Sequence, residues 1–236
     1  DGDMWFGTGR GVTRFDGETF RIYREGLMNH VIWSSFTDRH GGYWFGSDSG
    51  ASYYDESWLS IPLDFAVMSI VEDGSGSFWF HLTDGTKIRY DGHLGRQLSQ
   101  SSSTMGVHSL QDRQGNMWFA TMGGGMLRFD GQTWSAFATQ DGLASNVLFF
   151  NSICQDNDGI LWFGTGAGVS RYDGTSFQNI TVEDGLAYSD VYSMWADRRG
   201  FLWFGTANGL NRYDPSNPDN AFETYTMADS LADPGV

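Results

Sequence analysis

A short apolar pattern recurs along the chain and defines its organisation. A bulky residue, Trp, Phe and then usually a small residue follow one another six times, and the copies are about 35 to 45 residues apart. They are centred on Trp5, Trp44, Trp79, Trp118, Trp162 and Trp203. An apolar pair followed by Gly-Thr is typical of a buried strand that leaves the core into a turn. The spacing is that of propeller blades and other repeat arrays.

Residues 147–181 show one repeat in its clearest form. A strand over 147–155 is followed by Asp156-Asn157-Asp158-Gly159, the Trp-Phe strand, a third strand over 169–172, Asp173-Gly174, and a fourth strand. Asp accepts hydrogen bonds from backbone N–H groups two residues on, and Gly adopts the positive φ of such turns. Each repeat is therefore predicted to be a four-stranded antiparallel meander. Asp156 to Gly159 resembles a calcium loop but lacks the downstream Glu, so a turn is expected.

A single four-stranded sheet cannot cover both of its own faces. Six sheets arranged radially can, with Trp-Phe layers packed between neighbours, and this predicts an all-β fold, a β-propeller of six repeats. Residue 1 lies just before a Trp-Phe strand, so we expect five complete blades and one that lacks its innermost strand. Residues 1–236 are interpreted as a single propeller domain or an excerpt of a larger one.

Composition agrees with this fold and narrows the partners. Aromatic residues make up 16% of 236 residues, with 32 Gly and 4 Pro, which favours short strands with glycine turns over disorder. The formal net charge of −15 excludes the basic surface that nucleic acid requires. No stretch is long and apolar enough to span a membrane. Because the chain begins within a motif, a signal peptide or anchor would lie upstream.

The repeats resemble a known family. Asp197 to Asp214 matches almost in full the pattern Asp-x-x-Gly-x-Leu-Trp-Phe-Gly-Thr, then Gly-Leu-x-Arg-Tyr-Asp, and so do Asp156 to Asp173 and Asp112 to Asp130. On these motifs the whole chain is similar to the two-component regulator propeller repeats. The resemblance implies a bacterial periplasmic or extracellular sensor, associated with polysaccharide breakdown products, whose signalling domains lie elsewhere, or a secreted protein. Propeller lyases are distantly similar.

The ligand site is expected where the blades differ from one another. In a meander, the second turn and the connector between blades lie at one end, and there the repeats carry different polar and aromatic residues. The candidates are Arg10, His30, Asp48, Asp84, Asn146, Tyr188 and Asn208. A ring of such groups around an axial funnel predicts a ligand-binding face. Ordinary loop variation is the alternative.

Two histidines and one lysine break the repeat. His81 replaces Gly or Ala two positions after the repeat Trp, and His108 replaces a Ser of the innermost strand. The hypothesis is that both histidines approach the channel as ligand contacts, a metal pair, or an acid and base. The alternative is that each fills space and bonds a backbone carbonyl. Lys87 is left open between these roles, whereas Arg89 belongs to a recurring position, which predicts a structural salt bridge.

Four further residues are interpreted as structural. Cys154 lies in an apolar strand, has no partner for an internal disulfide, and is expected to be a buried, inert thiol. Trp33, Tyr192 and Trp195 lie on predicted innermost strands, and we interpret them as core residues rather than platforms for stacking sugars.

Three functions follow from these observations. The first is a non-catalytic propeller that binds a small molecule or an oligosaccharide without a cofactor. The second is a lyase or hydrolase that uses His81 and His108, with a divalent metal. The third is a scaffold for a protein partner. Aromatic and planar polar groups exposed around the funnel would favour the first, a metal held by either histidine the second, and a broad apolar patch the third.

Overall fold

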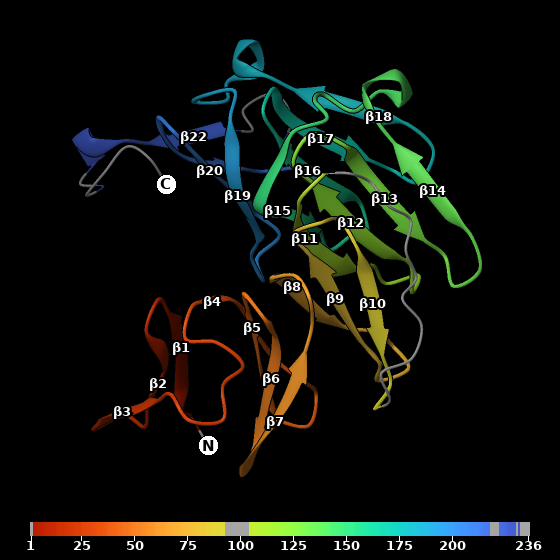
Figure 1. Cartoon of the computed structure of the whole chain (residues 1–236). Coiled ribbons are helices and arrows are strands. Elements are labelled where there is room, and N and C mark those ends of the chain that lie inside the picture. Colours follow the sequence, from red (N-terminus) through yellow and green to blue (C-terminus); the bar gives the residue numbers. More distant parts are fainter. Residues whose placement is uncertain (1, 93–103, 218–221, 230, 232–236) are drawn as a thin grey trace. The chain divides into compact units, whose positions relative to one another are not determined.

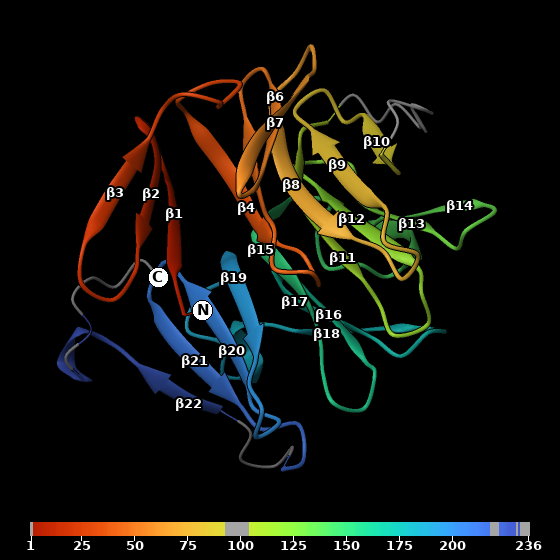
Figure 2. The same cartoon turned by 90° about the horizontal axis from the view of Figure 1, so that it is seen from below.

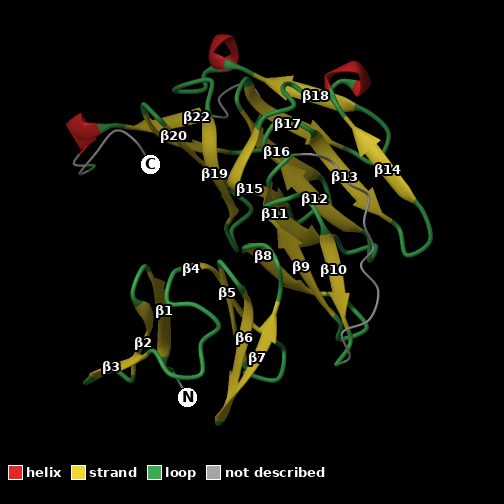
Figure 3. Cartoon of the chain, in the orientation of Figure 1, coloured by secondary structure: helices red, strands yellow, loops and turns green. Residues whose placement is uncertain are grey.

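The computed structural model of the chain describes residues 2–92, 104–217, 222–229 and 231. The chain divides into two compact units, residues 1–106 and residues 107–236, and each is described separately. Nearly all regular structure in both units is β-strand, with a few short helical turns between strands (Figure 3).

Residues 1–106 form three antiparallel sheets, called blades one to three, in chain order (Figure 1). Their strand orders are β1-β2-β3, β4-β5-β6-β7 and β8-β9-β10. The strands are β1 (Met4–Thr8), β2 (Gly11–Phe15), β3 (Phe20–Tyr23), β4 (Ile32–Thr37), β5 (Tyr43–Ser47), β6 (Gly50–Asp55), β7 (Ser57–Pro62), β8 (Val67–Glu72), β9 (Phe78–Leu82) and β10 (Lys87–Tyr90).

Residues 107–236 contain blades four to six, each an antiparallel meander of four strands (Figure 1). The strands are β11 (Gly106–Gln111), β12 (Met117–Thr121), β13 (Gly125–Phe129), β14 (Trp134–Phe137), β15 (Leu148–Gln155), β16 (Leu161–Thr165), β17 (Gly168–Tyr172), β18 (Phe177–Ile180), β19 (Val191–Ala196), β20 (Leu202–Thr206), β21 (Gly209–Tyr213) and β22 (Phe222–Tyr225). The 3-10 turns η1 (Thr139–Asp141) and η2 (Val182–Asp184) lie in the connectors between blades, and η4 (Met227–Asp229) follows β22.

The meander order and the all-β class agree with the prediction. Among the described residues, blade one consists of three strands, β1 to β3, in agreement with the expectation that its innermost strand is missing. Blade three also has three described strands. Its predicted fourth strand would follow Asp91-Gly92, and residues 93–103 lie outside the described part of the chain.

In blades three to six, an aspartate in the first turn fixes the repeat tryptophan. The Nε1 atoms of Trp5 and Trp44, in blades one and two, have no hydrogen-bond partner among the described residues. In blade five, Asp156 Oδ2 accepts a 2.7 Å hydrogen bond from Trp162 Nε1, while Oδ1 accepts from the backbone N–H groups of Asp158 and Ile160. The same Trp-to-Asp bond joins Trp79 to Asp73, Trp118 to Asp112, and Trp203 to Asp197. Each of these carboxylates thereby accepts hydrogen bonds from the protein's own donors, and the predicted turn is confirmed.

The ring of the repeat tryptophan packs onto the next blade. Within residues 107–236, the Trp162 ring lies 6.4 Å from that of Phe204 and 5.5 Å from that of Tyr213, and it is fully buried. In residues 1–106, Trp44 packs in the same way against Phe78 and Phe80. Apolar clusters therefore form between blades, which is how a sheet with two apolar faces is stabilised.

The recurring arginine is structural, although a salt bridge is only part of its role. Its guanidinium lies 5.9 to 6.0 Å from the centre of the repeat Trp ring in four blades, a cation–π distance. The pairs are Arg14 with Trp5, Arg89 with Trp79, Arg128 with Trp118 and Arg171 with Trp162. Salt bridges join Arg14 to Asp3, Arg89 to Asp73 and Arg212 to Glu223. Stacking on the tryptophan is therefore the more general interaction.

Cys154 lies in the apolar cluster between blades five and six. The side chain is 7% exposed, and the thiol is free. Burial raises the pKa of this thiol to about 12, with a smaller contribution from the charge of Asp156. The prediction of a buried, unreactive thiol is confirmed.

Replacing Asp156 by Ala should destabilise the protein strongly. The change leaves the buried Trp162 N–H without an acceptor and removes the acceptor of two backbone N–H groups. We expect a loss of about 2 to 4 kcal/mol in the free energy of unfolding, measured by urea denaturation. Asp158→Ala, at an exposed position of the same turn, is the matched control and should change this free energy by less than about 0.5 kcal/mol. Equal losses in both variants would contradict the role of the carboxylate.

Candidate functional site

Four innermost strands, β4, β8, β15 and β19, carry β-bulges at the same position. In β4, Ile32 pairs with Ser47 and Ser34 with Gly46, so Trp33 has no partner residue on β5. In β19, Val191 pairs with Thr206 and Ser193 with Gly205, which leaves Tyr192 unpaired in the same way. A bulge bends the strand locally and redirects the side chain of the extra residue.

These bulges turn aromatic side chains outward. Trp33 is 52% exposed and Tyr192 is 38% exposed. The interpretation of both residues as core was wrong, because strict alternation along a strand no longer holds across a bulge. Met68 is the bulged residue of β8, and its side chain is buried.

Trp195 is exposed for a different reason. It pairs with Trp203 across β19 and β20, on the face of blade six that carries the repeat Trp. The corresponding residue of blade five, Cys154, is covered by blade six, whereas Trp195 is 63% exposed in the described part of residues 107–236. Its prediction as a core residue was also wrong.

Blade five has the largest bulge. Leu148 pairs with Thr165 and Ile153 with Phe163, so residues 149–152 lie opposite Gly164 alone. Within this bulge Asn151 has a left-handed backbone, with φ of 54°, and its side chain is exposed. Asparagine is one of the few non-glycine residues that adopt this conformation readily, and residues in this conformation cluster at functional sites.

The bulges of β15 and β19 meet in one surface. The two strands lie side by side in both views (Figures 1 and 2). The Phe149 and Tyr192 rings are 4.8 Å apart in an edge-to-face arrangement, and Phe150 is 42% exposed. We call Phe149, Phe150, Asn151 and Tyr192 the inner aromatic surface. Phe149, Phe150 and Asn151 were not among the sequence candidates, although the longer first strand of that repeat was a visible signal.

Three of the loop candidates in residues 1–106, Arg10, His30 and Asp48, lie at exposed positions, and Asp84 is half-buried. The Arg10 carbonyl accepts a hydrogen bond from Arg24 Nε. Asp48 accepts a 2.6 Å hydrogen bond from the Nε1 of the bulged Trp33. Asp48 and Trp33 thus form one polar and aromatic pair in blade two.

The loop candidates in residues 107–236 divide into structural and free groups. Asn146 Oδ1 accepts from the Thr139 N–H, and Asn208 Nδ2 donates to the Ala187 carbonyl at 3.4 Å. Both amides therefore hold neighbouring turns together. Tyr188 is 44% exposed in the connector that leads into β19.

His81 and Lys87 lie in a row of blade three that is apolar in the other blades. The two residues pair across β9 and β10, and both are fully buried. Val12, Ala51, Met126 and Val169 hold the place of Lys87 in other blades, each opposite a glycine or alanine. A Cβ on Gly106 would clash with the His81 ring, so this glycine makes room for the imidazole.

Lys87 is the only lysine of the chain. Its ammonium donates a 2.5 Å hydrogen bond to the Gly85 carbonyl. Burial lowers the pKa of Lys87 to about 8, and the nearby charge of Asp84 opposes that shift. Asp84 itself accepts hydrogen bonds from the backbone N–H and the hydroxyl of Thr86.

His108 links two innermost strands of residues 107–236. Its Nδ1 accepts a 3.1 Å hydrogen bond from the Ile153 N–H, and burial lowers the pKa of the ring to about 4. Ser34 makes a comparable link in blade two, where its hydroxyl donates to the Val67 carbonyl. His108 thus has a structural contact of the kind that the alternative reading expected, although the histidine is the acceptor. His81 and His108 lie in different units, and their convergence stays a prediction.

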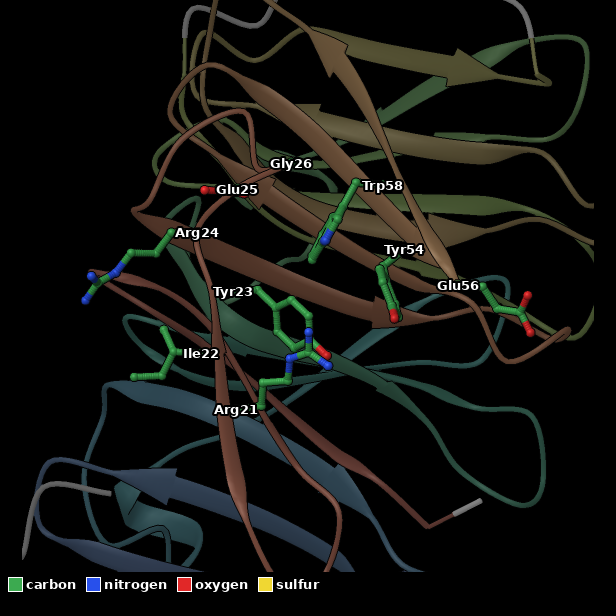
Figure 4. Close-up of a pocket in the computed structure, with 9 residues that line it drawn as sticks. All are labelled: Arg21, Ile22, Tyr23, Arg24, Glu25, Gly26, Tyr54, Glu56 and Trp58. Atoms are coloured by element: carbon green, nitrogen blue, oxygen red, sulfur yellow. The ribbon is translucent and has the colours of Figure 1, made fainter.

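A pocket of about 630 Å³ lies between the outer strands of blades one and two (Figure 4). It is lined by Arg21, Ile22, Tyr23, Arg24, Glu25, Gly26, Tyr54, Glu56 and Trp58. We call it the outer pocket. The rings of Tyr23, Tyr54 and Trp58 lie 4.9 to 5.8 Å from one another. The sequence candidates did not include it, because its residues belong to two different repeats.

Comparison with known proteins supports the repeat assignment. The family model described as "Two component regulator propeller" matches residues 142–167. The match covers one repeat and agrees with the resemblance seen in the sequence. It runs from the connector before β15 through β16, the strand of the repeat Trp162. None of the curated proteins matches the chain in sequence.

Solved structures share the propeller fold. The extracellular domain of the hybrid two-component system BT3049 from B. thetaiotaomicron has a TM-score of 0.83 at 24% identity, over 100% of this chain and 34% of that one. The chain thus spans about a third of that protein domain's length. Virginiamycin B lyase from Staphylococcus aureus has a TM-score of 0.77 at 16% identity, over 95% of this chain and 80% of that one. At these identities the likeness establishes the fold.

Among the described residues, no group of three or more His, Cys, Asp and Glu side chains is arranged to hold a metal ion. No helix within the described ranges is both long and apolar enough to cross a bilayer.

Replacing Lys87 by Met should stabilise the protein at pH 7 and give less benefit at higher pH. The pKa of Lys87 is about 8 in the folded protein, whereas the ordinary value of 10.5 applies in the unfolded chain. Between these two pH values the folded protein has released the proton and the unfolded chain still holds it. The parent protein therefore gains stability as pH rises between these values. We expect the advantage of Met to shrink by about 2 to 3 kcal/mol between pH 7 and pH 10, measured by urea denaturation.

A direct measurement complements the variant. Because Lys87 is the only lysine, labelling with ¹³C-lysine gives one side-chain NMR signal. Its titration midpoint should lie near 8. A midpoint near the ordinary lysine value, together with an advantage of Met that does not change with pH, would contradict the effect of burial.

Proposed function

We propose that the chain is the ligand-recognition part of a bacterial sensor that works in the periplasm or outside the cell, and that it binds oligosaccharides at the inner aromatic surface. The observation that carries the proposal is the outward display of Phe150 and Tyr192 by bulges on two neighbouring innermost strands. A bulge that exposes an aromatic ring loses the stabilisation that burying the ring would give, so packing does not explain its presence. A binding role does explain it.

The chemistry of this surface suits a sugar. The apolar C–H face of a pyranose packs on aromatic rings, and a planar amide donates and accepts hydrogen bonds to its hydroxyl groups. Phe150 and Tyr192 supply the rings, and Asn151 supplies the amide. None of these side chains is charged, which favours a neutral oligosaccharide over a charged one at this surface. The exposed Tyr188 in the adjacent connector extends the aromatic character.

The sensor role is supported by the repeat and by the fold. Residues 142–167 match the two-component regulator propeller model, and the first similar structure is an extracellular domain of a hybrid two-component system. The chain spans 34% of that domain. That a signalling partner acts together with this chain is therefore part of the proposal. Enzymatic chemistry at His81 and His108 has no comparable support, because His81 is buried and His108 Nδ1 is occupied by a backbone N–H.

A thermal-shift screen with neutral oligosaccharides tests the proposal. A ligand that binds only the folded protein raises Tm in proportion to ln(1 + [L]/Kd), so at least one oligosaccharide should raise Tm with and without divalent metals present. The double variant Phe150→Ala/Tyr192→Ala should then bind that ligand at least about tenfold more weakly, measured by calorimetry, because each stacked ring contributes on the order of 1 kcal/mol.

Phe65→Ala serves as the matched control. Phe65 is an exposed ring in the connector before β8, outside the inner aromatic surface, and its loss should leave affinity unchanged. The proposal fails if no oligosaccharide raises Tm, or if the double variant binds as well as the parent protein while remaining folded by circular dichroism.

A further inference from the structure

The outer pocket resembles an aromatic cage whose cation position is already filled. The guanidinium carbon of Arg21 lies 5.0 Å from the centre of the Tyr23 ring, which is a cation–π distance. Figure 4 shows this guanidinium against the Tyr23 ring. A cationic ligand would have to displace Arg21, so the cage is not built for one.

The flat face of the Arg21 guanidinium stacks on the Tyr23 ring, and the N–H groups along its edge remain available to a ligand. The side chain is exposed, and among the described residues it makes no ion pair. Stacking on a ring orients a guanidinium without using its N–H groups, which then point outward as a fork that matches a carboxylate.

Glu56 adds an independent observation on the opposite wall of the pocket. It occupies the turn between β6 and β7 with φ of 58°, the left-handed region. The same turn carries Gly17, Gly92, Gly131 and Gly174 in other blades, all with positive φ. A glutamate there costs on the order of 1 kcal/mol relative to glycine. Strained residues of this kind are found at functional sites, where the side chain has a task.

We propose that the outer pocket binds a sugar acid, a hydroxylated ring that carries a carboxylate. The Arg21 fork takes the ligand carboxylate, and Glu56 accepts hydrogen bonds from ring hydroxyl groups. Tyr54 and Trp58 line the pocket and contact the apolar face of the ring. The volume of about 630 Å³ is that of a small-molecule site. This pocket is separate from the inner aromatic surface, and its ligand is anionic where the other ligand is neutral.

Calorimetric or ligand-observed NMR titration of the full chain tests the proposal with three probes of matched ionic strength. Sodium glucuronate carries the carboxylate and the hydroxyl groups, glucose lacks the carboxylate, and benzoate lacks the hydroxyl groups. Glucuronate should bind, with a Kd in the millimolar range expected of a small polar ligand, and at least about tenfold more tightly than either other probe.

Two variants place the binding at this pocket. Arg21→Met should weaken glucuronate binding at least about tenfold, whereas Arg198→Met, an equal loss of charge at an exposed turn of blade six, should leave it unchanged. Glu56→Gly should weaken binding about threefold or more while Tm stays equal or rises, because glycine relieves the left-handed backbone. A merely structural role of Glu56 would not separate affinity from stability in this way.

Several outcomes would overturn the proposal. Absence of glucuronate binding up to about 50 mM would do so, as would an Arg21→Met protein that binds as the parent does. Equal binding of glucose would remove the role of Arg21, and equal binding of benzoate would remove the sugar. Because Phe150 and Tyr192 lie outside this pocket, their double variant should bind glucuronate normally, which distinguishes failure here from failure of the proposed oligosaccharide site.

Discussion

The hydrogen bond from the repeat tryptophan to the turn aspartate connects the local structure of a blade to the packing between blades. Trp162 could lie in many orientations on the face of its sheet, but the 2.7 Å bond to Asp156 fixes the indole edge. The ring face is then presented to Phe204 and Tyr213 of blade six. Because the same carboxylate also closes the turn, hairpin geometry and inter-blade contact are set by a single buried group, and burial makes that group costly to lose.

Blade three shows how far a repeat can change while this arrangement persists. Its Asp73 still binds Trp79, and although burial opposes the shift, bonds from Ser75, Trp79 and Arg89 keep the pKa of Asp73 at about 2. One row away, a histidine and a lysine occupy core positions, and the neighbouring Gly106 provides the space. The large His81 side chain therefore fits because the residue beside it, Gly106, has no side chain. The free-energy cost of burying the Lys87 charge appears as the lowered pKa of Lys87.

The features that the sequence predicts well are those whose partners are near in the chain. Asp156 and Trp162 are six residues apart, so the turn and the strand could be recognised together. The outward position of Tyr192 depends on how β19 pairs with β20, and alternation alone gives the wrong side. The partner of His108 is 45 residues away, and the outer pocket joins Arg21 of one repeat to Trp58 of the next.

The bulge has a consequence for how such a protein can diversify. Trp33, Met68 and Tyr192 occupy equivalent positions with three different side chains, yet the pairs on either side keep the same register. Blade five even inserts further residues there without disturbing the Trp162 row. A residue outside the hydrogen-bond ladder can be exchanged without shifting its neighbours to the wrong face of the sheet. The exposed residue of the bulge and the core of the blade are thus encoded at separable positions, so a lineage, or a designer, can change the first while the fold stays constant.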